Sequence, residues 1–354
     1  MSFLKSFILL EMNIEEINNP LIQNQLTLKI VPISIRELLF ITKCPCDVYG
    51  IKDGLFFRCL RKGVFTNKNL LRDLIAKDQT NLFCKREDSS LIMDNVKNNL
   101  LIVTRSLSVG NSLEKCKQLI NLITINMGYL YSEPNNDSHL KLQHQCAKNL
   151  AYFLMNNINY LEPLQKDLVK QKHHFIYAQP MIASLFLIGL LKYSKLYSDK
   201  EIEDLFIASY FKDIGMSTIP TEKYNSENLT DHEKVLLNKH PESSVQILKG
   251  RIPLSPSSLK IIKNHHAFSL LREDYSIEPQ NNNSDEEMIV GFETVLVISM
   301  DIISAMITGR PFKKPTKLFD ALDLIKKIIA DQYPQEFKLI VGYFKQFFFD
   351  KPKR

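Results

Sequence analysis

The sequence predicts a mostly α-helical protein in which a small α/β module precedes an all-helical C-terminal bundle. Two observations predict this class. Apolar residues recur at helical spacing over most of the chain after residue 92, whereas residues 27–91 contain short β-like runs. With 45% hydrophobic and 24% charged residues, the 354-residue chain can bury a core and keep a solvated surface.

The α/β module is expected over residues 27–91, after an N-terminal tail of residues 1–26. Lys52-Asp53-Gly54 separates two apolar runs and is a good hairpin signal. A helix is expected over residues 67–77, with its leucines on one face. The expected strands cover residues 28–33, 47–49, 55–60 and 82–84. No pattern in the module has catalytic spacing, so we predict sensing, docking to a protein partner, or dimerisation.

Residues 92–170 are expected to form a helical connector, interrupted by the polar stretch 132–138. Leu119, Ile120, Ile123 and Met127 recur at the spacing of an amphipathic helix. Such a helix can pair with its copy in a second subunit and make a homodimer. It can equally pack on its own chain, and the sequence leaves both arrangements open.

Residues 171–354 are expected to be helical almost throughout. Thr230 and Glu233 make a capping box, and Pro241 suits the first turn of the next helix. Ser255 or Ser257 can cap a helix that carries His265 and His266. A further helix has the apolar stripe Leu318, Leu322, Ile325 and Ile329. The polar stretch 278–287 is expected to be a surface loop.

Several functional classes are excluded by composition. The 11 glycines are never closer than four residues apart and no two are five apart, so neither a GxGxxG nor a GxxxxGKS/T phosphate loop can occur. The six cysteines fit no zinc knuckle and are too sparse for a disulfide scaffold, which predicts reduced thiols in a cytoplasmic protein. The uncharged run 175–191 is short for a membrane span and is expected to be a buried core helix.

Histidines and aspartates in the helical half carry the chemical signal. Six of the eight histidines lie there, and the candidates among them are His173, His174, His240, His265 and His266. Asp213 ends an apolar run, and Asp301 lies within VLVISMDIISAM. A carboxylate in such a run is costly to bury unless it is paired or bound to a cation. Several such groups on helices favour a transition-metal site.

Four segments resemble, in order, the motifs of the HD-GYP group of metal-dependent phosphohydrolases, which cleave cyclic di-GMP. These segments are ASYFKDIGMSTIP (208–220), LTDHEKVLLNKHPESSVQIL (229–248), IIKNHHAF (261–268) and VLVISMDIISAMITGRPFK (295–313). The resemblance covers about residues 171–350 and implies an HD-type helical bundle over residues 171–354.

The resemblance also implies two metal positions. One set maps to Gln179, Lys212, Asp213 and Asp301. The other maps to Asp213, His240, His265 and His266. The first set has lost both of its family histidines and gained a lysine, which has no lone pair to give while protonated. The second set is complete.

Two further departures affect the reaction. Met216 replaces a family lysine, and the glycine-bearing GYP loop is absent after Ala267. We therefore predict that Lys212 supplies positive charge in place of the missing ion, and we assign Lys212 and Asp213 as the residues of any remaining catalysis. The predicted metal residues are Asp213, His240, His265, His266 and Asp301. One ion of iron, manganese or zinc, or no ion at all, would be bound.

The leading functional prediction is a degenerate HD-GYP-like protein, catalytically weak or inactive, that acts in signalling or scaffolding. The alternative is an active phosphodiesterase with one metal, or with His173 or His174 rebuilding the first site. A third class is a nucleotide sensor that binds without cleaving. The missing GYP segment argues against cyclic di-GMP as its ligand.

Net charge adds no further partner. The formal charge is +6, and residues 309–354 contain 11 basic and 5 acidic residues. Lys326 and Lys327 fall on the polar side of an amphipathic helix, and no arginine-rich or aromatic-interleaved repeat occurs. We therefore expect a solvated face and no nucleic-acid partner. The phenylalanines at 347–349 are expected to dock on the domain or on a partner.

Overall fold

The computed structural model describes residues 15–16, 29–52, 55–77, 81–225, 228–267 and 291–349. The chain divides into two compact units, Met1–Ile125 and Asn126–Arg354, and each is described by itself. Two predicted features lie outside the described residues, namely the Asp53-Gly54 turn and the loop 278–287. The same holds for the side chains of residues 347–349.

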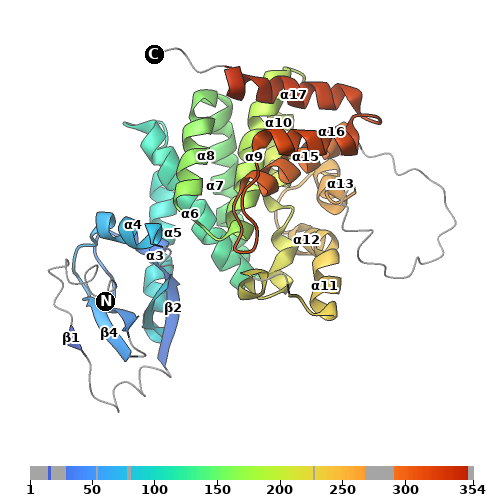
Figure 1. The fold of residues 1–354 in the computed structure, drawn as a ribbon. Helices are drawn as coiled ribbons and strands as arrows, with labels where there is room; N and C mark the ends of the chain where they lie inside the picture. Colours follow the sequence, from blue (N-terminus) through green and yellow to red (C-terminus); the bar gives the residue numbers. More distant parts are fainter. Residues whose placement is uncertain are drawn as a thin grey trace. The chain divides into compact units, whose positions relative to one another are not determined.

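The first unit contains an antiparallel sheet in the order β1-β4-β3-β5-β2. Figure 1 labels β1, β2 and β4 of this sheet. Its strands are β1 (Glu15–Glu16), β2 (Ile30–Ser34), β3 (Val48–Lys52), β4 (Leu55–Leu60) and β5 (Asn81–Lys85). β3 and β4 pair as the predicted hairpin, with Lys52 opposite Leu55. The β-branched and aromatic residues of these runs suit a pleated surface with one buried face.

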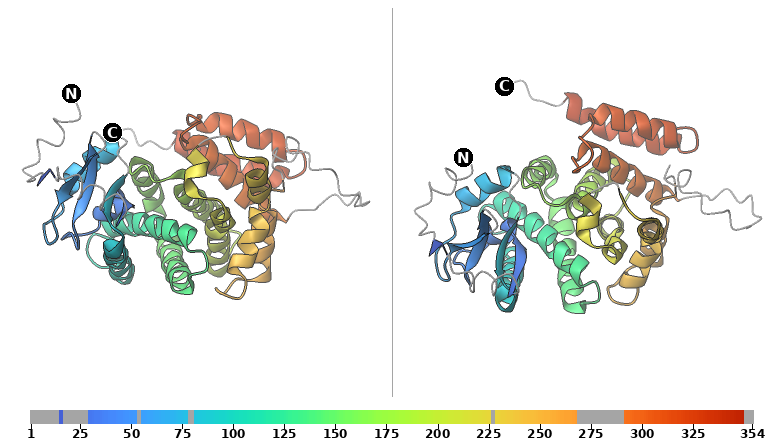
Figure 2. Two further views of the ribbon diagram at one scale, coloured as in Figure 1. Left: turned by 90° about the horizontal axis from the view of Figure 1, so that it is seen from below. Right: turned by 60° about the horizontal axis from the view of Figure 1, so that its bottom comes forward.

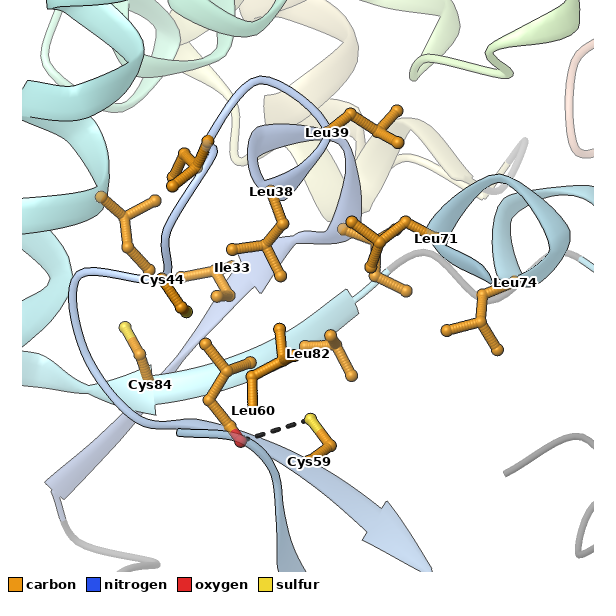
Figure 3. Packing of buried hydrophobic residues seen from close by; sticks show 14 of the residues in the cluster. Ile33, Leu38, Leu39, Cys44, Cys59, Leu60, Leu71, Leu74, Leu82 and Cys84 are labelled. Atoms are coloured by element: carbon orange, nitrogen blue, oxygen red, sulfur yellow. Dashed lines mark hydrogen bonds between the residues drawn. The ribbon is translucent and has the colours of Figure 1, made fainter. Parts of the chain in front are cut away.

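The core of the first unit lies beside this sheet (Figure 3). The predicted helix is confirmed as α4 (Lys68–Ala76), whose N-terminus is capped by the Asn67 side chain and whose leucines face the core. Cys44 and Cys59 are buried there with the aliphatic side chains. Burial raises the pKa of both thiols to about 12, so they behave as small apolar groups. The unit also contains α3 (Ile35–Leu38) and α5 (Ser89–Arg105).

Helix α6 (Ser112–Ser132) begins in the first unit and ends in the second. The second unit is otherwise built from helices. They are α7 (Asp137–Met155), α8 (Leu161–Lys170), α9 (Phe175–Ser194), α10 (Asp199–Phe211), α11 (Asp231–Asn238), α12 (His240–Leu248), α13 (Pro256–Asn264), α15 (Phe292–Ile307), α16 (Leu318–Ile329) and α17 (Pro334–Phe349). Figure 2 shows the last three grouped together.

Helix α9 is the predicted core helix. It packs against α8, α10, α15 and α17, and its residues from Ala178 to Leu191 are buried apart from Gln179, which is half-buried. Among the described residues it is the one helix long and apolar enough to cross a membrane, but 78% of its most apolar window is buried inside the fold. A helix that is apolar on all sides is expected at the centre of a bundle.

The local signals of the second unit are confirmed with one correction. Thr230 and Glu233 form the capping box of α11, and Ser255 caps α13. Helix α13, however, ends at Asn264, so it does not carry the two histidines as predicted. His265 is its C-cap, and the chain turns there. The two histidines therefore follow the C-terminus of α13 instead of lying along one of its faces.

Close packing of α9 on α17 predicts a sensitive position at Gly189. A Cβ atom there would meet the Tyr343 hydroxyl and lie 2.7 Å from the ring carbon that bears it. Overpacking costs about 1–3 kcal/mol, more than the ~1 kcal/mol that alanine gains in helix propensity. We expect Gly189→Ala to lower the free energy of unfolding by about 1 kcal/mol in urea denaturation.

Gly309→Ala is the matched control, because its Cβ would lie 3.6 Å from Pro315, an ordinary contact. It should unfold like the wild-type protein. A Gly189→Ala variant as stable as Gly309→Ala would contradict this close approach of the two helices.

Candidate metal centre

Four predicted residues converge on one point in the second unit. Asp213, His240, His265 and His266 each offer one ligand atom, and these atoms all lie within 4.8 Å of one another. Asp213 follows α10 at the start of a 3₁₀ turn (Ile214–Thr218), His240 opens α12, and the other two follow α13. Each side chain thus stands at a helix end, where the chain changes direction.

The turn that carries Asp213 is tied closely to α12. Ser244 donates a hydrogen bond to the Lys212 carbonyl at 2.6 Å and accepts one from the Gly215 amide at 2.8 Å. A Cβ atom at Gly215 would overlap the His240 carbonyl and lie 2.6 Å from the Ser244 amide nitrogen. Glycine is therefore needed at 215, and its absent side chain lets α12 bring His240 up to Asp213.

Backbone carbonyls fix the orientation of two imidazoles. His240 Nδ1 lies 2.5 Å from the Leu237 carbonyl, and His265 Nδ1 lies 2.6 Å from the Ile262 carbonyl. A carbonyl oxygen only accepts, so each Nδ1 must carry the hydrogen. In a neutral imidazole the other ring nitrogen, Nε2, then presents a lone pair, which is the arrangement of a metal ligand.

These Nε2 atoms face one another and the carboxylate. The distances are 3.1 Å between His240 and His265, 3.2 Å between His266 and His240, and 3.1 Å from His265 Nε2 to Asp213 Oδ1. Burial lowers the pKa of His265, and burial followed by the neighbouring imidazoles lowers that of His266 well below its usual range. In their neutral forms, His240 and His265 would point their Nε2 lone pairs at one another, which favours a shared cation between them.

The donor set suits a transition metal. Three imidazole nitrogens and one carboxylate oxygen are ligands that zinc and iron accept, whereas calcium and magnesium prefer oxygen alone. The tautomers set by the Leu237 and Ile262 carbonyls present the lone pairs that such an ion requires. The residues present therefore fit one metal ion.

Lys212 is fully buried beside this cluster. Its Nζ lies 2.8 Å from Asp301 Oδ1 and forms an ion pair with Asp213 Oδ2. Burial alone would lower the pKa of Lys212 and raise that of Asp213. Their mutual attraction outweighs burial, so the lysine pKa is raised and the Asp213 pKa lies well below its usual range. Both groups are ionised.

Two further polar side chains extend this ion pair. Gln179 donates to Asp301 Oδ1 at 3.3 Å, and Arg310 donates to the Gln179 oxygen at 3.2 Å. The four residues that map to the first metal position are thus joined to one another through the Lys212 ammonium. Asp301, the fifth predicted metal residue, contacts Lys212 and Gln179 and lies outside the cluster of four.

The other histidines that the sequence singled out lie outside the cluster of four. His174 Nε2 lies 3.0 Å from Asn225 Oδ1, and its ring stacks on Phe175. Sequence reasoning missed Ser244, Arg310 and Tyr131, whose hydroxyl bonds the Asp213 carbonyl. Arg310 falls inside a segment with family resemblance, but no sequence signal marks Tyr131.

Comparisons with known proteins agree with this fold. A family model described as an HD domain matches residues 164–334. No curated protein matches the chain closely enough to count as a relative. Among solved structures the fold is similar to that of Bd1817, an HDG"Y"P protein from Bdellovibrio bacteriovorus, with a TM-score of 0.62. The alignment covers 89% of this chain and 99% of that one at 16% identity, so the likeness is one of fold.

The ion pairs of Lys212 predict a large stability effect. Lys212→Met would leave two neighbouring carboxylates in the interior without their cation. Breaking a buried ion pair on one side costs about 3–5 kcal/mol, and we expect a loss of that size in the free energy of unfolding, measured in urea.

Lys200→Met is the matched control, because Lys200 also contacts two carboxylates, those of Glu203 and Asp204, but at the surface. Its replacement should cost about 1 kcal/mol or less. Equal effects of the two variants would show that the buried ammonium is not needed for folding.

Proposed function

This chain is an HD-superfamily, HD-GYP-like protein, and from that premise we propose that it binds a single transition-metal ion and hydrolyses phosphodiesters weakly or not at all. In this proposal its role lies in signalling or scaffolding. The residues that would hold the ion are Asp213, His240, His265 and His266, whose ligand atoms converge.

One observation carries the proposal, namely the Lys212 ammonium between Asp213 and Asp301. By family resemblance, an ion of a metal pair would stand at that place. The ammonium supplies positive charge to the two carboxylates, which offsets the cost of burying them without an ion. An ammonium has no vacant coordination position, however, and cannot hold a hydroxide or a phosphoryl oxygen as a ligand.

A bound ion would supply Lewis acidity and a more acidic water. The protein's part is to hold the lone pairs of the three imidazoles toward one point and to keep Asp213 ionised. The two oxygens of Asp213 have different partners. Oδ1 faces His240 and His265, whereas Oδ2 is paired with Lys212. The carboxylate therefore bridges an ammonium and one ion site, and no second ion shares it. Hydrolysis that depends on a two-metal clamp should be slow.

The departures outside the metal site support the same proposal. Met216 replaces a family lysine, and the chain has no GYP segment. The first unit has a hydrophobic core of its own, and no residue pattern in it has catalytic spacing. We therefore propose that this unit contacts a protein partner or a second copy of the chain, and that cyclic di-GMP is not the ligand of the second unit.

One preparation tests the proposal. After anaerobic purification, elemental analysis should find about one transition-metal ion per chain, and cyclic di-GMP should turn over no faster than in buffer. His265→Ala should lose most of the ion because one of four ligands is removed. The control His232→Ala concerns an exposed histidine and should keep it. Turnover of cyclic di-GMP that Asp213→Ala abolishes would overturn the proposal.

Restoring the two lost imidazoles should restore a second site. In the double variant Lys212→His and Gln179→His, the ammonium is gone and two nitrogen ligands join Asp213 and Asp301. We expect elemental analysis to show about one additional ion per chain relative to the wild-type protein. Lys212→Met, which removes the charge and adds no ligand, is the control and should not gain an ion. An unchanged metal content in a folded double variant would refute the substitution of Lys212 for an ion.

A further inference from the structure

Tyr131, in the last turn of helix α6, contacts the centre from outside the ligand set. Its hydroxyl donates a hydrogen bond of 2.7 Å to the main-chain carbonyl of Asp213, and both residues are buried. A carbonyl oxygen can only accept, so the phenol hydroxyl is the donor of this bond. A buried phenol with this geometry is a directional contact between α6 and a residue of the metal site.

The ring of Tyr131 is itself held in place. It packs edge-on against Tyr177 of α9, with centroids 5.1 Å apart and an interplanar angle of 80°. The Tyr177 hydroxyl in turn lies 2.6 Å from the Thr221 hydroxyl. With its ring packed in this way, Tyr131 cannot move its hydroxyl far without moving α6 or α9.

The position of the Asp213 carboxylate depends on this main chain. Its Oδ1 must face the imidazoles while Oδ2 faces Lys212, so a small rotation about residue 213 changes both contacts. On either side of Asp213, Ser244 bonds the carbonyl of Lys212 and the amide of Gly215. Tyr131 holds the carbonyl of Asp213 itself and does so from another helix.

We propose that Tyr131 is a positioning residue for the metal centre, through which helix α6 sets the metal affinity of Asp213. The inference rests on the proposed metal binding. Removing a group that hydrogen-bonds to a metal-ligand residue, without binding the metal itself, typically weakens metal affinity by about 10–100-fold. Because Tyr131 lies in the last turn of α6, a change in that turn would reach the metal centre through this hydrogen bond.

Titration of the metal-free full chain with Co²⁺ tests the inference, because the visible spectrum of this ion reports ligand geometry. Tyr131→Phe keeps the ring and removes only the hydroxyl. We expect about 10-fold weaker Co²⁺ binding and an altered visible spectrum. The matched control is Tyr224→Phe, because the Tyr224 hydroxyl donates at 2.8 Å to Met216, a carbonyl of the same turn on a residue outside the ligand set. This control should keep the wild-type spectrum and affinity.

If Tyr131→Phe does not fold, Tyr177→Leu replaces it, since that change keeps the Tyr131 hydroxyl but removes the ring that it packs against. It should weaken binding in the same direction, whereas Tyr177→Phe should not. Equal losses in Tyr131→Phe and Tyr224→Phe, or wild-type binding in Tyr131→Phe, would overturn the inference alone. Absence of Co²⁺ binding by the wild-type protein would overturn the proposed function and the inference together.

Discussion

The buried ammonium of Lys212 is the constraint on which the centre depends. A cation in the interior loses its hydration, a cost of several kcal/mol that neighbouring carboxylates must offset. Asp213 and Asp301 provide that compensation, at 2.8 Å in the second case. The pairing keeps Asp213 ionised, directs its Oδ2 to the lysine, and leaves Oδ1 to the imidazoles. The division of the two Asp213 oxygens between the ammonium and the imidazoles follows from this arrangement.

The imidazoles depend on a different physical rule, the direction of a hydrogen bond. The Leu237 and Ile262 carbonyls can only accept, so they fix the protons of His240 and His265 on Nδ1 and turn the Nε2 lone pairs inward. Close approach at Gly215 then brings these rings to Asp213. The convergence of the four side chains is therefore a product of main-chain geometry at three helix ends as much as of the side chains themselves.

Much of the fold could be predicted because its signals are local. The Thr230 capping box, the hairpin of β3 and β4, and the apolar run of α9 each depend on residues close together in the sequence. The prediction that α13 carries His265 and His266 was wrong, because nothing local between Asn264 and His266 marks a helix end. The structure shows that both imidazoles make contacts outside α13, with His240 and, for His265, with Asp213.

For the site, the residue types could be read from the sequence alone: three histidines, two aspartates and a lysine that cannot ligate while it is protonated. The sequence also placed Asp213 and Asp301 in apolar runs, where an unpaired charge would be too costly. Which of these residues pair with Lys212 and which form the cluster of four became clear only from the packing of the helices. The tertiary structure pairs Lys212 with both carboxylates, leaves Asp301 outside the cluster of four, and brings Tyr131 to the Asp213 carbonyl over a separation of 82 residues. Such pairings depend on packing between distant helices, which no local pattern records.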